Sequence, residues 1–283
     1  MRMSSASAAL LMLGPGAFFV LFFLAPFLQL VGESFIKAEG GFTLQNYADV
    51  LSDAYYWTAL FNTLWISFWV TACCFLLGYP LAYFTVFRVR ASWARRCIYI
   101  LLIMPLFTSN IVRAFGWIVI LGRRGIVNQS LTLIGLTNSP LELLYNKLSI
   151  VIGLTYILLP VMVLTICSVL QSIDRTLIEV ARDLGASPSM AFLTVTFMLT
   201  LPAVAAGSII VFALSASAYV IPSILSGGRE VVMPTLIFQQ YVATFRPDIG
   251  ATLSVVLLVV TLLLIGVYLY FMERHPALAR AQI

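Results

Sequence analysis

Six long apolar blocks, separated by polar loops, follow one another along this chain of 283 residues. A helix needs about 20 mostly apolar residues to cross a bilayer, and each block has this length. The pattern predicts an all-α, polytopic membrane protein with six spans, approximately at Ala9–Val31, Leu60–Thr85, Ile98–Leu121, Leu148–Leu170, Leu201–Leu225 and Ala251–Met272. The first block runs on to Val31, which is too long for the apolar region of a cleaved signal peptide.

Basic residues indicate how these helices are oriented, because short loops rich in Arg and Lys stay in the cytoplasm. The loop Val86–Cys97 holds four arginines, whereas Gly32–Ala59 is mainly acidic. We therefore expect both termini in the cytoplasm, with Gln171–Thr200 as the second internal loop. The domains expected are a first helix with its external loop (1–57), a transmembrane core (58–273) that contains the polar loop 171–200, and a cytoplasmic tail (274–283).

Composition supports membrane embedding and argues against several other classes of protein. Hydrophobic residues make up 61% of the chain and charged residues 10%, whereas soluble domains carry about 25% charged residues. The net charge of +5 is explained by topology signals and anionic lipid, so no nucleic-acid partner is expected. The four cysteines lack metal-ligand spacing and are expected to pack as small apolar residues between helices. No metal site is predicted.

The polar segment between the fourth and fifth blocks has the pattern of a short amphipathic helix. Thr176 and Glu179 fit a capping box at its start, and Gly185 is suited to the left-handed conformation that ends a helix. Ser187 and Pro188 have the spacing that begins a second helix. The apolar stripe consists of Leu177, Ile178, Ala181 and Leu184. Such a helix either lies on the bilayer surface or fills a groove on another protein.

The segment Glu179–Gly185 resembles the EAA loop of permeases in ABC-type importers, with Val180 in place of the first Ala of the motif. Asn62–Leu64 and Gly78–Tyr83 are also typical of this class. A narrower likeness, to the permeases of spermidine, putrescine and opine importers, rests on three further segments; aminophosphonate importers share the pattern. These segments are Val112–Trp117, Gly125–Asn128 and Gly153–Pro160.

The resemblance implies a MetI-like, type I ABC importer fold in the bacterial cytoplasmic (inner) membrane. It implies that the loop docks on a cytoplasmic ATPase, with coupling carried by Glu179, Ala181, Leu184 and Gly185. The implied partners are two ATPase subunits, a second and different permease chain, and an external, periplasmic substrate-binding protein. The chain has no phosphate loop of the type G-x-x-x-x-G-K-[ST]. We therefore expect ATP and Mg to be bound by the partner ATPase and no cofactor in this chain.

Candidate residues for the substrate pathway are fewer. Arg113 is the one charge inside a predicted span, and such a charge marks a site unless it snorkels or pairs with a backbone carbonyl. Asn110 and Trp117 have the spacing to share its helix face. Tyr156 and Tyr219 either line the pathway or pack within the bundle. Arg113 suits a carboxylate or phosphonate, whereas a polyamine would find only aromatic faces and carbonyls here.

Two other classes of protein compete with an importer permease. An ion-coupled secondary transporter usually buries carboxylates or histidines as proton relays. A membrane-bound enzyme needs a cluster of reactive side chains at one depth. Neither pattern occurs within the six apolar blocks, so the sequence favours a transport subunit that is not an enzyme.

Overall fold

The computed structural model describes residues 14–37 and 40–274, and these residues are mostly helical. Five helices among them are long and apolar enough to cross a membrane, and a sharply bent pair is a sixth candidate. Four of the five match predicted spans: Gly14–Glu33, Ala54–Arg88, Lys147–Ser172 and Pro247–Met272. The expected start of the first span, Ala9, lies outside the described residues. The chain divides into two compact units, Met1–Ala59 with Leu236–Val259, and Leu60–Thr235 with Val260–Ile283.

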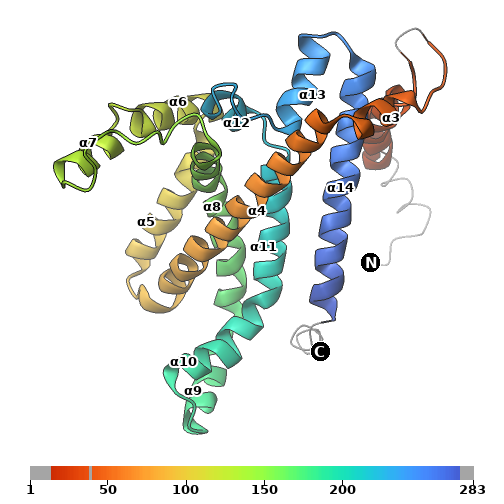
Figure 1. The fold of residues 1–283 in the computed structure, drawn as a ribbon. Coiled ribbons are helices and arrows are strands. Elements are labelled where there is room, and N and C mark those ends of the chain that lie inside the picture. The colour runs from red at the N-terminus through yellow and green to blue at the C-terminus, as the bar shows by residue number, and fades with distance from the viewer. Residues whose placement is uncertain (1–13, 38–39, 275–283) are drawn as a thin grey trace, which may run out of the picture. The chain divides into compact units, whose positions relative to one another are not determined.

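Helix α8 (Lys147–Ser172) is the centre of the second unit and packs along α11 (Met198–Ala216) (Figure 1). Its Met162 side chain is fully buried. The contact is close because Met162 meets two glycines, Gly78 of α4 (Ala54–Tyr83) and Gly207 of α11. Small residues let membrane helices approach each other, and van der Waals packing then stabilises the pair.

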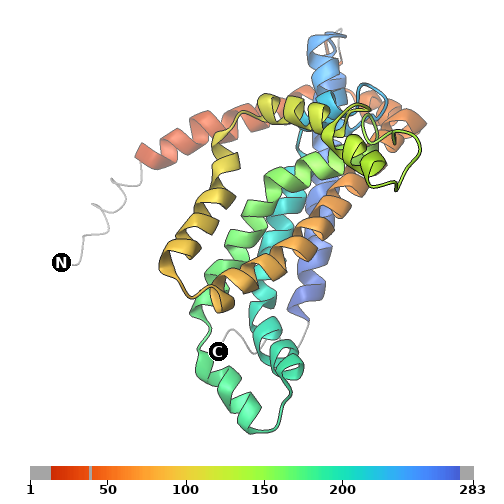
Figure 2. The ribbon, with the colours of Figure 1, turned by 90° about the vertical axis from the view of Figure 1, so that its left-hand side faces the viewer.

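The third apolar block does not form one straight span, which corrects the prediction. Helix α5 (Ser92–Ile103) continues into the 3-10 turn η3 (Met104–Phe107), and the chain then turns into α6 (Asn110–Leu121) and α7 (Ile126–Leu133). The two halves meet at 103°, as the change of direction between them in Figure 2 shows. Pro105 cannot donate a backbone hydrogen bond, and Thr108 adopts an extended conformation. Both features end the first half.

The fifth span also differs from its predicted bounds, because it runs from Pro188 to Ala216. It begins early since α10 (Pro188–Ala191) and the π-helical turn η4 (Phe192–Phe197) lead into α11 without a break. It ends early since the chain leaves the helix after Ala216 and restarts as α12 (Val220–Leu225). The structure also corrects one detail about the cysteines: Cys74 and Cys167 are buried, whereas Cys97 is exposed.

The first unit contains the π-helical turn η1 (Val20–Leu24), α2 (Ala25–Glu33) and α3 (Gln45–Ser52), together with parts of α13 (Met233–Val242) and α14 (Pro247–Glu273). The Asn46 side chain of α3 donates hydrogen bonds to the backbone carbonyls of Ser34 and Ile36, at 3.1 and 3.0 Å. These bonds hold the segment after α2 against α3. Arg246 donates to the carboxylate of Asp248 at 2.9 Å, and this bond raises the pKa of Arg246.

Candidate coupling loop and substrate pathway

Helix α9 (Arg175–Asp183) forms the first part of the polar loop, and its N-cap is Asp174. The Asp174 carboxylate accepts a hydrogen bond from the backbone N–H of Thr176 at 3.0 Å. Its hydrogen bonds with the backbone and side chain of Thr176 lower the pKa of Asp174. The predicted cap at Thr176 is therefore wrong. Asp and Thr are both good N-caps, and the structure starts the helix at the earlier of the two.

The C-terminal end of α9 confirms the prediction for Gly185, which has a φ of +90°. The Gly185 N–H donates to the Arg182 carbonyl at 2.9 Å, and the Ala186 N–H donates to the Ala181 carbonyl at 3.0 Å. These two bonds form a Schellman motif, which satisfies carbonyls that the end of a helix leaves free. The predicted second helix is also present, because the Ser187 hydroxyl accepts from the Met190 N–H at 3.3 Å.

One face of α9 is apolar and uncovered. Leu177 is 48% exposed, Val180 53% and Leu184, at the C-cap, 84%; their spacing of three and four residues places them on one side of the helix. Ile178 and Ala181 are half-buried and Glu179 is exposed. Figures 1 and 2 show α9 and α10 projecting beyond the ends of α8 and α11. We call Leu177, Val180 and Leu184 the uncovered face. Val180 is not among the residues predicted for the apolar stripe, although its spacing of three residues from Leu177 is a signal for it.

The structure brings Asn110, Arg113 and Thr108 together at the start of α6. The Arg113 Nη2 atom donates to the Asn110 side-chain oxygen at 2.7 Å and to the Thr108 carbonyl at 2.6 Å. Sequence analysis left open whether Arg113 snorkels or pairs with a backbone carbonyl, and the bond to Thr108 is a pairing of the second kind. The Nε and Nη1 atoms of Arg113 are buried and have no hydrogen-bond partner among the described residues.

Trp117 and Tyr156 form an aromatic pair between α6 and α8, with ring centroids 5.7 Å apart and planes at 76°. This edge-to-face arrangement is one that aromatic rings prefer. Tyr219 is half-buried at the N-cap of α12, and α12 packs on α6. The candidate pathway residues thus come from three neighbouring helices, while their role in transport remains a prediction.

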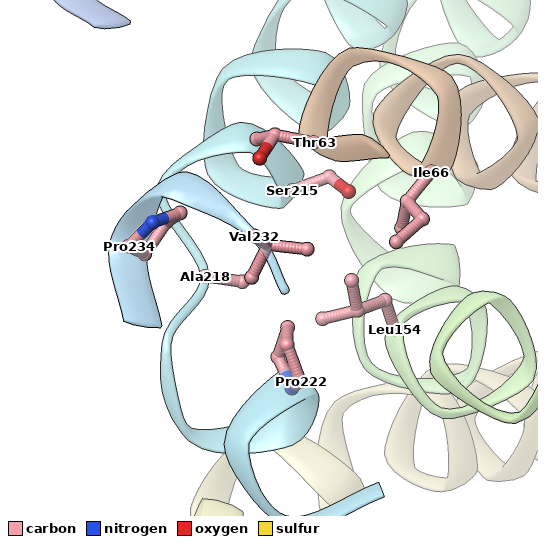
Figure 3. Close-up of a pocket in the computed structure, with 8 residues that line it drawn as sticks. All are labelled: Thr63, Ile66, Leu154, Ser215, Ala218, Pro222, Val232 and Pro234. Atoms are coloured by element: carbon pink, nitrogen blue, oxygen red, sulfur yellow. The ribbon is translucent and has the colours of Figure 1, made fainter. Parts of the chain in front are cut away.

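A small cavity lies between α4, α8, α11 and α12 (Figure 3). Its volume is about 10 Å³, which is room for one water molecule at most. It is lined by Thr63, Ile66, Leu154, Ser215, Ala218, Pro222, Val232 and Pro234. This cavity is too small for a transported solute. Within residues 14–37 and 40–274, no group of three or more His, Cys, Asp or Glu side chains could hold a metal ion.

Known proteins resemble this chain in sequence and in fold. The family described as "Binding-protein-dependent transport system inner membrane component" matches residues 74–275. The spermidine/putrescine transport system permease protein PotB of Salmonella typhimurium (strain SL1344) is 31% identical over 255 residues, which cover 88% of each chain.

Among solved structures, a bacterial ABC transporter involved in the import of the acidic polysaccharide alginate matches with a TM-score of 0.76. The match covers 95% of this chain and 96% of that one, at 18% identity. The bacterial alginate ABC transporter in complex with its alginate pentasaccharide-bound periplasmic protein gives a TM-score of 0.73, with 95% and 94% covered, also at 18% identity. These likenesses confirm the type I ABC importer fold predicted from the sequence. With its family match over most of its length, this chain belongs to the binding-protein-dependent transport system inner membrane components and is a transport permease.

Proposed function

We propose that this permease forms half of the membrane pathway of an ATP-driven importer and that α9 is where its ATPase docks. The uncovered face carries this proposal. An apolar stripe on a short, capped helix that projects beyond the bundle is the surface that a hydrophobic groove recognises. Leu177, Val180 and Leu184 bury no large area within the chain, so a partner would gain free energy by covering them.

The energy for transport comes from this partner, because the sequence has no Gly-Lys dipeptide and so no phosphate loop of the usual kind. The proposed assembly holds two ATPase subunits, a second permease chain and a periplasmic binding protein. ATP and Mg bind to the ATPases. Glu179, Ala181, Leu184 and Gly185 are the coupling residues of this chain, and Val180 joins them through its place in the uncovered face.

The proposed cargo is a small polyamine, the solute class in the name of the PotB relatives. The aromatic pair Trp117 and Tyr156 offers ring faces or edges to an ammonium group. Arg113 is the local obstacle to a cation. Its bonds to Asn110 and Thr108 place its charge against two oxygens, which reduces the repulsion. A solute with a carboxylate or phosphonate is the second candidate, favoured by the Nε and Nη1 atoms of Arg113, which have no hydrogen-bond partner in the described part of the chain.

Docking is tested by substituting Leu184→Gln, with Arg182→Gln on the opposite side of α9 as the matched control. Each variant is expressed in cells together with the ATPase and the second permease, and the ATPase that co-purifies is measured. We expect Leu184→Gln to lose most of the bound ATPase and Arg182→Gln to retain it. Equal retention by both variants would show that the uncovered face does not bind the ATPase.

Cargo is tested in liposomes that contain the whole complex, with the binding protein and ATP supplied. Uptake of labelled spermidine is compared with uptake of 2-aminoethylphosphonate. ATP-dependent accumulation of spermidine supports the polyamine proposal, whereas accumulation of the phosphonate supports the second candidate. Uptake by this chain alone, without ATPase or ATP, would instead indicate an ion-coupled secondary transporter.

A further inference from the structure

Next to the polar loop, the π-helical turn η4 packs against the end of α4, where a second π-helical turn, η2 (Phe84–Arg88), begins. Turn η2 follows α4, and turn η4 precedes α11. π-helical turns are rare and occur frequently at functional sites. Five aromatic side chains meet here, and we call them the aromatic joint: Tyr79 and Tyr83 of α4, Phe87 of η2, and Phe192 and Phe197 of η4.

Edge-to-face packing holds the aromatic joint together. The rings of Tyr83 and Phe192 lie 5.2 Å apart at 88°, and those of Tyr79 and Phe197 lie 5.5 Å apart at 60°. Tyr83 also packs on Phe87, with centroids 5.0 Å apart. Tyr79 is buried, and the other four side chains are half-buried. Aromatic side chains are stiff, so a displacement of one ring is passed to its neighbours rather than absorbed by rotamer changes.

The joint touches α9 directly. Arg175, the first residue of α9, places its guanidinium carbon 5.5 Å from the centroid of the Phe87 ring, within the range of a cation–π contact. The opposite end of the loop leads through α10 into η4, which supplies Phe192. A movement of α9 therefore reaches the joint at Phe87 by contact and at Phe192 through the chain.

Inside the bundle, the joint connects to α11 through a buried hydrogen bond. The hydroxyls of Tyr79 and Thr200 lie 2.9 Å apart, and both residues are buried. Thr200 donates to the carbonyls of Thr196 or Phe197, at 3.0 Å in each case. The Thr200 hydroxyl oxygen can then accept a hydrogen bond from the Tyr79 hydroxyl. This bond ties α4 to the first turn of α11.

We propose that the aromatic joint transmits the movement of the docking helix to α4, and that Tyr83, Phe87 and Phe192 are positioning residues for transport. The proposal rests on the function proposed above. Helix α4 continues into η2 and α5 rather than into the polar loop, so the backbone does not connect it directly to α9. The contacts of Phe87 with Arg175 and of Tyr83 with Phe192 provide that connection.

The test uses the complete complex in liposomes, with the binding protein, and measures ATP hydrolysis and uptake separately. Tyr83→Leu and Phe87→Leu remove joint rings but keep apolar volume. Phe84→Leu is the matched control, because Phe84 lies in the same π-helical turn as Phe87 and is 54% exposed. We expect the joint variants to retain the ATPase and to hydrolyse ATP. Their uptake per ATP should fall about tenfold, within the range of mutations that alter coupling, while Phe84→Leu behaves as the unaltered chain.

Unchanged uptake per ATP in both joint variants would overturn the proposal, and so would a parallel loss of hydrolysis and uptake, which indicates only a structural role. If the leucine variants fail to assemble into the complex, Tyr79→Phe tests the proposal instead. This variant keeps every ring of the joint and removes only the hydrogen bond to Thr200. A fall in uptake per ATP supports the joint, and an unchanged value overturns it. Failure of the unaltered chain to bind the ATPase would instead refute the function on which the joint depends.

Discussion

The sulfur of Met162 in α8 lies 2.8 Å from the position that a Cβ atom would occupy on Gly207 in α11. Real Cβ atoms essentially never come within 3.0 Å of a non-bonded heavy atom, so only glycine fits here without movement. On its other side, Met162 is 3.2 Å from the corresponding Cβ position of Gly78 in α4. The Met162 side chain thus packs at the point where α4, α8 and α11 come close together.

Gly207→Val should destabilise the bundle. Overpacking a well-filled core costs about 1–3 kcal/mol, and the branched Val side chain cannot avoid Met162. Gly266→Val is the control, because a Cβ atom there meets nothing within 4 Å. Thermal unfolding of the purified protein in detergent is the measurement. A Gly207→Val midpoint equal to that of the control would contradict this account of the contact.

Gly185→Ala should lower the uptake per ATP hydrolysed. The φ of +90° at this position is strained for an L-residue, and adopting it costs about 1–2 kcal/mol. There is open space around the position, so the effect comes from the backbone and not from a clash. Gly185→Asn should retain more uptake per ATP, because Asn adopts this conformation more readily. If Ala and Asn gave the same uptake per ATP, the left-handed turn would not be what the loop requires.

The N-terminus of α9 should become less protected at low pH. The folded pKa of Asp174 lies below its ordinary value, so the stabilisation is complete above the unfolded pKa of about 3.9. It is lost as the pH falls through the lowered folded pKa. Hydrogen exchange at the Thr176 amide, corrected for the intrinsic pH dependence of exchange, measures this loss. Asp174→Asn keeps a good cap without a titrating group, and its corrected protection should not change with pH.

Arg113→Ala should lower thermal stability more than Asn110→Ala. The first change removes two hydrogen bonds at the bend and the second removes one. A hydrogen bond contributes about 1 kcal/mol on average, and 1 kcal/mol shifts the unfolding midpoint of a chain of this size by about 2–4 °C. The measurement is thermal unfolding in detergent. A greater loss in Asn110→Ala would mean that Arg113 does not stabilise the bend.

The loop around α9 shows how far local sequence can be followed. Gly185 and Ser187 were placed correctly because a left-handed turn and an N-cap are decided by residues a few positions away. Thr176 was not the cap, because Asp174 can cap as well and sequence alone does not rank the two. Asn110, Arg113, Trp117 and Tyr156 were named as candidates, and the structure shows which of them pair.

The apolar blocks by themselves determined that this chain lies in a membrane as a bundle of helices, because each block is long enough to cross the bilayer as a helix that satisfies its own backbone hydrogen bonds. The spacing of apolar and capping residues within the polar loop determined that this loop would carry a helix. Only the tertiary structure decided that the third block bends by 103° at Thr108 and Ser109. It alone brought Tyr83 against Phe192 and Phe87 against Arg175. Such contacts join residues remote in the sequence, and side-chain packing between helices, rather than any local pattern, decides which of them meet.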